Sequence, residues 1–243
     1  QYIERLEEQP NRTIMFLRPR KFGKTLFTST LECYYDINKK DKFDELFKNT
    51  YIGQNPTPNR NKYCILRFNF SGVNTDTIES TLKGFREKVD LGINAFVESY
   101  GLDFYNNPEQ STEALLGNLF QAFRFQLIEQ KIYVIIDEYD HFANELLGFN
   151  PEQFRALVSK NGKVRKWYEI LKKGTETVVD RIFITGVAPI TLDSLTSGFN
   201  IGTDITQDVR FNEMMGFTKN ELIEILNSQD ILKEEQEQIL PIM

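Results

Sequence analysis

Apolar runs and helical periodicities alternate along this 243-residue chain. Nearly unbroken apolar runs predict strands, because a strand covered on both faces has no polar side. These predicted strands cover residues 12–17, 63–70, 132–137 and 178–186. Strands that alternate with helices are typical of a parallel α/β sheet with right-handed crossovers.

Apolar residues at steps of three or four predict the helices. They cover residues 24–35, a long segment from about 76, 112–130, 151–173 in two pieces, 219–228 and 232–240. Asp76 with Glu79, and Thr218 with Glu221, resemble the reciprocal capping boxes that begin helices. A loop rich in Gly, Ser and Thr is predicted from about 186 to 208.

The first predicted strand runs directly into a short basic loop that closes with Gly-Lys-Thr before a helix. This layout is typical of a phosphate-binding loop, or Walker A motif. Backbone N–H groups and the helix N-terminus favour a bound anion, the lysine adds charge for the outer phosphates, and the threonine hydroxyl can hold Mg²⁺. Arg18 stands where the general pattern has glycine, and the alternative is a helix N-terminus with a solvated basic loop.

Two carboxylates, Asp137 and Glu138, follow the third predicted strand. Ligands bind at the carboxyl ends of strands in open α/β sheets, so this pair is typical of a Walker B motif. We expect Asp137 to lie close to Mg²⁺ and Glu138 to polarise the attacking water. The alternative is a solvated strand end or a helix cap. The 113 positions between Lys24 and Asp137 leave room for an additional strand between the two motif strands.

Composition limits the class of protein. Hydrophobic residues make up 40% and charged residues 26%, as in globular proteins. The net charge of −6 gives no overall attraction to nucleic acid or membranes. However, no acidic residue lies between Glu8 and Glu32, a stretch that predicts a local anion site through its cations Arg12, Arg18, Arg20, Lys21 and Lys24.

The two cysteines, Cys33 and Cys64, lie in apolar stretches and are interpreted as buried, reduced thiols, which favours a cytoplasmic protein. No apolar run approaches the roughly 18 residues needed to span a membrane. The N-terminus does not resemble a signal peptide. Because the sequence begins with Gln1 rather than methionine, we expect a fragment of a longer protein.

His141 and Asp140 come directly after the acidic pair. A lone histidine cannot form a usual zinc site, so His141 is interpreted as a solvated or hydrogen-bonded loop residue. Asp140 is interpreted as a cap of the next segment or a partner of a loop base, with assistance at the metal through water as the alternative.

Several blocks together resemble the bacterial AAA-ATPase-like family, over about residues 1–228. The loop Arg18-Pro19-Arg20-Lys21-Phe22-Gly23-Lys24-Thr25 resembles that family's Arg-Pro-Arg-Arg-Phe-Gly-Lys-Ser loop and accounts for Arg18. Further similar blocks are Val134-Ile135-Ile136-Asp137-Glu138-Tyr139-Asp140, Ile184-Thr185-Gly186-Val187-Ala188-Pro189-Ile190, Gly198-Phe199-Asn200-Ile201, Asp208-Val209-Arg210-Phe211 and Gly216-Phe217-Thr218.

The resemblance implies a P-loop NTPase of AAA type, a three-layer α/β/α fold with a mainly parallel sheet, followed by the start of a small helical lid. It places the ATPase core at residues 1–212 and the lid at 213–243. Thr185 resembles the polar sensor, with a simple strand-end threonine as the alternative. Arg210 resembles an arginine whose guanidinium contacts the nucleotide, either of its own chain or of a neighbouring one. The alternative is a surface or interdomain salt bridge. Full-length members often carry a C-terminal nuclease-like domain, which we do not expect within this sequence.

We therefore expect an ATP-binding, Mg²⁺-dependent ATPase that acts as a motor or switch for a partner or an effector domain. The expected catalytic residues are Glu138, Lys24, Thr185 and Arg210; the expected metal ligands are Thr25 and Asp137; and the expected ATP-binding residues are Arg18, Pro19, Arg20, Lys21, Phe22, Gly23, Lys24, Thr25 and Leu26. The adenine preference comes only from the resemblance.

Three other functions stay open. A nucleotide-gated regulatory module would retain nucleotide with negligible turnover. An ATPase subunit of a DNA-processing nuclease would carry its nuclease elsewhere, since the acidic charge argues against direct DNA binding by this chain. A kinase would need an acceptor site, for which the sequence offers no indication. A homo-oligomer is also left open.

Overall fold

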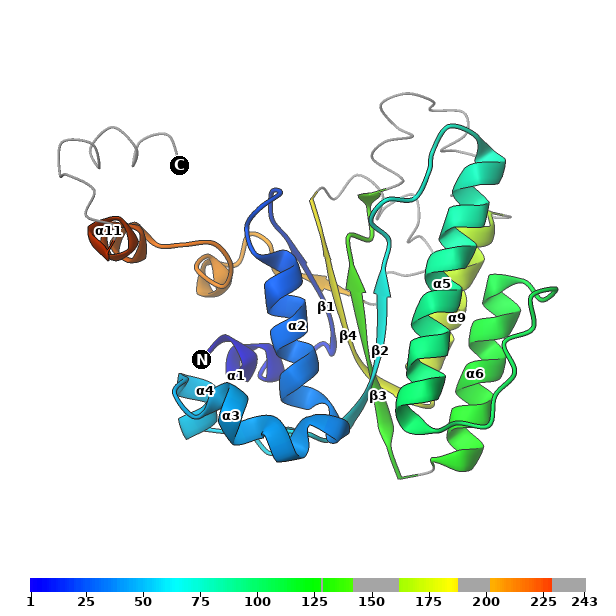
Figure 1. Cartoon of the computed structure of the whole chain (residues 1–243), viewed down its shortest axis with the longest axis horizontal. Coiled ribbons are helices and arrows are strands. Elements are labelled where there is room, and N and C mark those ends of the chain that lie inside the picture. The colour runs from blue at the N-terminus through cyan, green and yellow to red at the C-terminus, as the bar shows by residue number, and fades with distance from the viewer. Residues whose placement is uncertain (128, 142–161, 188–201, 229–243) are drawn as a thin grey trace.

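Five strands form one parallel sheet in the computed structural model of this chain (Figure 1). The structure describes residues 1–127, 129–141, 162–187 and 202–228. The order across the sheet is β2-β3-β4-β1-β5. The strands are β1 (Thr13–Leu17), β2 (Tyr63–Asn69), β3 (Lys131–Asp137), β4 (Val179–Gly186) and β5 (Thr203–Asp204). The predicted parallel α/β fold is therefore confirmed.

A single strand, β4, separates the loop-bearing β1 from the acidic β3. It pairs with both neighbours, as Phe16↔Thr185 on one side and Ile136↔Ile184 on the other. An additional strand between the motif strands was expected. The strand that fills this place follows β3 in sequence, whereas β2, from the stretch between the motifs, lies at the outer side of β3.

Helices cover both faces of the sheet (Figure 1). One face carries α5 (Ile78–Tyr100), α6 (Thr112–Gln126) and α9 (Lys163–Gly174). The other carries α2 (Lys24–Tyr35), with α1 (Tyr2–Glu7), the 3₁₀ helix η1 (Ile37–Lys42), α3 (Phe43–Phe47) and α4 (Tyr51–Gln54) on the same side. After β5 come a 3₁₀ turn, η3 (Val209–Phe211), and α11 (Lys219–Ser228), which lies beyond α2 in Figure 1.

The strand side chains alternate between two hydrophobic cores, because successive residues of a strand point to opposite faces. In β2, Cys64, Leu66 and Phe68 join the core beneath α5, α6 and α9. Tyr63 and Ile65 join the core beneath α2. Full burial of each large apolar side chain contributes about 1.5–3 kcal/mol, so both layers stabilise the sheet that carries the site.

Most predicted elements are confirmed to within two residues, and α2 has the predicted bounds. Glu221 and Thr218 form the predicted capping box before α11. The predicted cap of α5 was wrong by one residue, since Thr77 and Ser80 form the box. The predicted end of α6 was too late, because the helix stops at Gln126.

Other expectations need correction or lie outside the described residues. The predicted loop contains β5, whose first residue, Thr203, pairs with Ile14. Both cysteines are free, but only Cys64 is buried and Cys33 is partly exposed. The first helical piece after residue 151, most of residues 186–201 and the predicted helix at 232–240 lie outside the described residues. The division at 212/213 stays a prediction.

Among the described helices, none combines the length and the apolar character required to cross a lipid bilayer.

Candidate functional site

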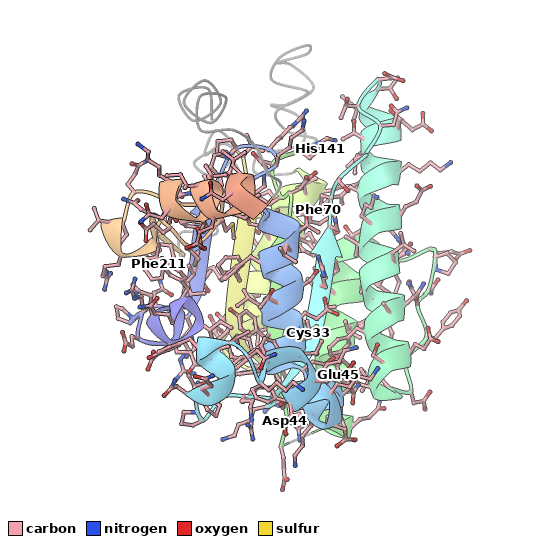
Figure 2. All side chains as sticks on the ribbon, turned by 60° about the vertical axis from the view of Figure 1, so that its left-hand side comes forward. Cys33, Asp44, Glu45, Phe70, His141 and Phe211 are labelled. Atoms are coloured by element: carbon pink, nitrogen blue, oxygen red, sulfur yellow. The ribbon has the colours of Figure 1, made fainter. Side chains whose placement is uncertain are left out.

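The predicted residues of the loop after β1, of the acidic pair and Thr185 lie at the carboxyl end of the sheet, where β1, β3 and β4 finish at Leu17, Asp137 and Gly186. Figure 2 shows Phe70 and His141, which follow β2 and β3, at this end of the sheet, and Asp44 and Glu45 of α3 at the opposite end. Open α/β sheets bind ligands at this edge.

The loop between β1 and α2 has a left-handed backbone at two positions, Lys21 (φ 69°) and Gly23 (φ 79°). Gly23 caps α2, and its carbonyl accepts the first helical bond from Phe27 N. Glycine at position 23 adopts this conformation without a Cβ clash, whereas Lys21, which has a Cβ, is strained in it. Successive N–H groups in such turns, together with a helix N-terminus, form an anion-binding concavity.

Lys24, the first residue of α2, is 5% exposed, and its ammonium points back into the loop. Its Nζ donates to Arg18 O at 3.1 Å and to Pro19 O at 2.9 Å. Burial lowers the pKa of this ammonium, and the negative charges of Glu138, Asp137 and Asp140 act in the opposite direction. The loop lysine and the acidic residues after β3 therefore share one electrostatic environment.

Asp137 is fully buried, and within the described part of the chain neither of its carboxylate oxygens has a hydrogen-bond partner. The hydroxyl of Thr185, on the neighbouring strand, is likewise buried and unpaired among the described residues. Buried polar groups without partners are rare and costly, so they point to an additional polar ligand. An oxygen-preferring cation suits this carboxylate.

Thr25 lies in the first turn of α2 with an exposed side chain, as a ligand-holding hydroxyl requires. The described residues contain no cluster of three or more His, Cys, Asp or Glu that could hold a metal by themselves. One hydroxyl and one carboxylate, completed by phosphate oxygens and water, is the donor set that Mg²⁺ accepts. The residues present therefore fit Mg²⁺ with a phosphate ligand.

Glu138 has a left-handed backbone (φ 53°), which turns the chain sharply after β3. Its side chain is 30% exposed, and its Oε2 lies 3.8 Å from Nδ1 of His141. His141 thus fits the predicted role of a loop residue. Asp140 is buried and accepts a hydrogen bond from Val187 N, so it fastens this turn to the segment that follows β4.

Arg18 faces away from the loop interior. Its guanidinium donates to Leu17 O at 3.0 Å and Thr206 O at 3.1 Å, reaches Asn212 O at 3.3 Å, and lies 4.1 Å from the Phe16 ring centroid. This side chain therefore holds the segment after β5 against β1. The role of Arg18 in ATP binding stays a prediction. Because its side chain is engaged in these contacts, the prediction now concerns the backbone of Arg18.

The basic stretch is less concentrated than the sequence predicted. Arg12 pairs with Asp180 at the amino end of β4 and does not reach the loop, so its place in a local anion site was wrong. Arg20, Lys21, Phe22 and Leu26 are exposed on or next to the loop. They remain available to a ligand there.

Arg210 lies in η3, where its guanidinium binds the Asp208 carboxylate at 3.0 Å and contacts Gln9 Oε1 at 3.4 Å. Its backbone carbonyl accepts from Arg5 of α1. These contacts match the salt-bridge alternative within this chain. The role of Arg210 toward nucleotide stays a prediction.

An apolar pocket of about 250 Å³ opens beside the loop, between Phe22 and Leu26 on one side and Met214, Met215 and Phe217 on the other. A neighbouring hollow of about 220 Å³ continues along Arg20, Phe22 and Leu222 of α11. Flat apolar ligands favour such sites, which have charged groups at one end.

Arg67 was missed by the sequence analysis. This β2 residue lies 3.7 Å from Asp137 Oδ2. An arginine within an apolar run is unusual, and this was the signal that the sequence offered. Its proximity to Asp137 depends on the register of β2 and β3, which pairs Asn69 with Asp137.

Two comparisons with known proteins found matches, and the family model agrees with the resemblance. A model of the AAA-ATPase-like family, described as a predicted AAA-ATPase, matches residues 1–196. A protein of Azotobacter chroococcum mcd 1, named "Uncharacterized protein in vnfD 5'region", is 25% identical over 205 residues. The match covers 84% of this chain and 36% of that relative, so the chain spans about a third of the relative's length.

Proposed function

Because the chain belongs to the AAA-ATPase-like family, we propose that it binds ATP with Mg²⁺ at the carboxyl end of the sheet and hydrolyses it. The observation that carries this proposal is that Lys24, at the start of α2, and Asp137, at the end of β3, lie at the same end of the sheet, and that the Asp137 carboxylate has no hydrogen-bond partner among the described residues. Two elements separated by β4 supply an ammonium and a carboxylate there. A triphosphate with its metal suits that pair.

Each residue has a distinct role in this proposal. Backbone groups of residues 18–26 hold the phosphates, and the Lys24 ammonium exchanges its two loop carbonyls for the outer phosphates. Thr25 and Asp137 would hold Mg²⁺. When bound, this ion would neutralise negative charge on the β- and γ-phosphates. Asp137 is already desolvated, so binding a cation relieves a cost present in the empty protein.

Glu138 accepts a proton from the attacking water, or orients that water, from its partly exposed position after β3. Thr185 directs its hydroxyl to the γ-phosphate or the water. Arg210 contributes a guanidinium, from this chain after release from Asp208 or from a neighbouring copy. Catalysis in this class is mostly positioning and charge stabilisation.

The base lies in the apolar pocket beside the loop, against Phe22, Leu26 and Phe217. An adenine ring has the flat apolar faces that this pocket suits. This assignment rests on the family and on the position of the pocket next to the phosphate loop.

We further propose that the ATPase works in the cytoplasm as a motor or switch for an effector domain or a partner protein. The support is the length of the relative, of which this chain matches 36%. A C-terminal nuclease-like domain, as the family resemblance implies, is one candidate effector. A self-assembled oligomer in which Arg210 serves a neighbouring site is a second arrangement.

The decisive experiment compares ATP turnover by wild type and Glu138→Gln. Loss of a general base lowers the rate by about 10²–10⁴-fold, whereas ATP affinity stays close to that of wild type. Glu79→Gln, an exposed carboxylate of α5, is the control with unchanged turnover. Equal hydrolysis by wild type and Glu138→Gln would rule out this role for Glu138. Tight ATP binding with negligible wild-type turnover would favour the regulatory module.

A further inference from the structure

Arg67 is a half-buried arginine in β2 with contacts to two other elements. On α2, its guanidinium donates to Glu32 Oε2 at 2.7 Å, to Ser29 Oγ at 3.1 Å and to Thr28 Oγ1 at 3.1 Å. On β3, one nitrogen lies 3.7 Å from Asp137 Oδ2, the distance of an ion pair rather than a hydrogen bond. A single side chain therefore joins three elements.

The two elements that Arg67 connects to β2 are those that carry the proposed metal ligands. Thr28 lies three residues after Thr25 on α2, so the two are on neighbouring turns of one helical face, and Asp137 ends β3. Because helices and strands are rigid over such short spans, the contacts of Arg67 help to hold the first turns of α2 in place relative to the Asp137 carboxylate.

Arg67 also compensates the charge of Asp137. The carboxylate is fully buried, and an uncompensated charge in such a place is strongly destabilising. Because the guanidinium approaches Oδ2, Oδ1 is left for another ligand. Glu32 binds one terminal nitrogen of the guanidinium at 2.7 Å, and the other terminal nitrogen is the one that lies 3.7 Å from Asp137.

We propose that Arg67 is a positioning residue for the metal: it orients Asp137 and sets its distance from Thr25, and so determines the Mg²⁺ concentration at which ATP binds fully. This proposal rests on the proposed function. Partners that orient a metal-binding carboxylate typically change metal affinity 10–100-fold when they are removed. The planar guanidinium is suited to the task, because its several donors have fixed directions.

The test is a Mg²⁺ titration at a fixed ATP concentration, in which ATP binding is measured by thermal melting. Arg67→Met removes the charge and all four contacts, so the half-saturating Mg²⁺ concentration rises by about 10-fold or more. ATP affinity measured by calorimetry in EDTA, where no metal can bind, changes by less than about 2-fold, since Arg67 has no proposed phosphate contact.

Two milder variants keep the test valid if Arg67→Met fails to fold. Glu32→Gln breaks one ion pair and leaves Asp137 intact, so a shift of the same sign but smaller size is expected. Arg67→Lys retains the charge without the fork of donors and gives an intermediate shift. The matched control is Arg86→Met, which removes a comparably buried arginine that pairs with Asp90 on α5, on the opposite face of the sheet from α2, and lowers the melting temperature only.

The outcomes distinguish a failure of this proposal from a failure of the proposed function on which it rests. If ATP does not stabilise the wild-type chain at any Mg²⁺ concentration, the proposed function fails. If wild type responds but Arg67→Met, Arg67→Lys and Glu32→Gln all share its half-saturating Mg²⁺ concentration, only the role of Arg67 is wrong. A shift in Arg86→Met as large as that in Arg67→Met would reduce Arg67 to a structural residue.

Discussion

Two carboxylates, at opposite ends of the sheet, are treated differently by the fold. Glu7 accepts hydrogen bonds from the Tyr35 hydroxyl at 3.0 Å, the Thr57 hydroxyl at 2.7 Å and the Asn59 amide at 2.8 Å. Asp137 is more deeply buried, and among the described residues it receives no hydrogen bond; a guanidinium nitrogen of Arg67 lies 3.7 Å from its Oδ2, and the charge of Lys24 also acts on it.

The contrast extends to the surroundings of each carboxylate. At the amino end, Tyr63 donates to Asp180 at 2.6 Å, which adds another satisfied acid. At the carboxyl end, Lys21 and Glu138 have left-handed backbones, and the Thr185 hydroxyl is unpaired within the described structure. Left-handed backbone is not confined to this end, since Asn61 before β2 also has it, and buried atoms of Asn61 and Arg181 lack a hydrogen-bond partner among the described residues. The clearest contrast is therefore between the carboxylates: Glu7 and Asp180 accept hydrogen bonds, whereas Asp137 accepts none within the described structure.

The largest expected effect comes from Lys24→Ala at the carboxyl end. In wild type, Mg-ATP at about 100 times its Kd stabilises the fold by roughly 2.7 kcal/mol. For a domain of this size, that corresponds to a rise of about 5–10 °C in melting temperature. Lys24→Ala removes the charge on the outer phosphates, so this rise disappears. Thermal melting with Mg-ATP, Mg-GTP and no nucleotide measures it, and a full rise in the variant contradicts the assignment.

A paired substitution tests the comparison itself. Asp137→Asn removes a charge that the fold pays to bury, so the free energy of unfolding without ligand stays level or rises by up to about 2 kcal/mol. Glu7→Gln disrupts satisfied hydrogen bonds to a charged group and lowers the same free energy by about 1–3 kcal/mol.

Ligand binding is expected to respond in the reverse order. Asp137→Asn loses the Mg²⁺ dependence of ATP binding, whereas Glu7→Gln keeps it. Urea unfolding and a Mg²⁺ titration of both variants provide the two measurements. The comparison breaks down if Asp137→Asn destabilises the empty protein as much as Glu7→Gln does.

The smallest effect concerns pH. Burial lowers the pKa of Lys24 from 10.5, and phosphates bind its charged form, so ATP affinity falls as the pH rises through this lowered pKa. Folding without nucleotide has the opposite sign, because the cost of burying the ammonium disappears over the same range. Lys24→Arg stays charged. Calorimetry at a series of alkaline pH values should show a weaker pH dependence for this variant than for wild type.

The confirmed elements have strong local signals. The boundary of α2 follows from the glycine at 23, whose left-handed backbone begins the helix. The continuous apolar run of β3 indicates a strand buried on both faces. Short elements lack such signals: β5 has two polar residues and depends on pairing with Ile14 and Met15, far away in sequence.

The site was partly predictable for the same reason. The position of Lys24 and Asp137 at the carboxyl end of the sheet could be predicted because each stands at or shortly after the end of a strand in a recognisable local pattern; their roles stay predictions. The cap of α5 was misjudged because Asn74 binds Asp76 N in a separate turn, which leaves the capping role to Thr77. Arg67 reaches Asp137 only through strand register, and Arg12 moves away from the loop by pairing with Asp180. Such long-range contacts have no local pattern.

The most direct test is a crystal structure of the chain with a non-hydrolysable ATP analogue and Mn²⁺, located by its anomalous signal. The account predicts one ion with oxygen ligands from Thr25 and Asp137 at about 2.1 Å, with the triphosphate between that ion and Lys24. A triphosphate bound elsewhere, or an ion that lacks Asp137 as a ligand, would contradict the central claim.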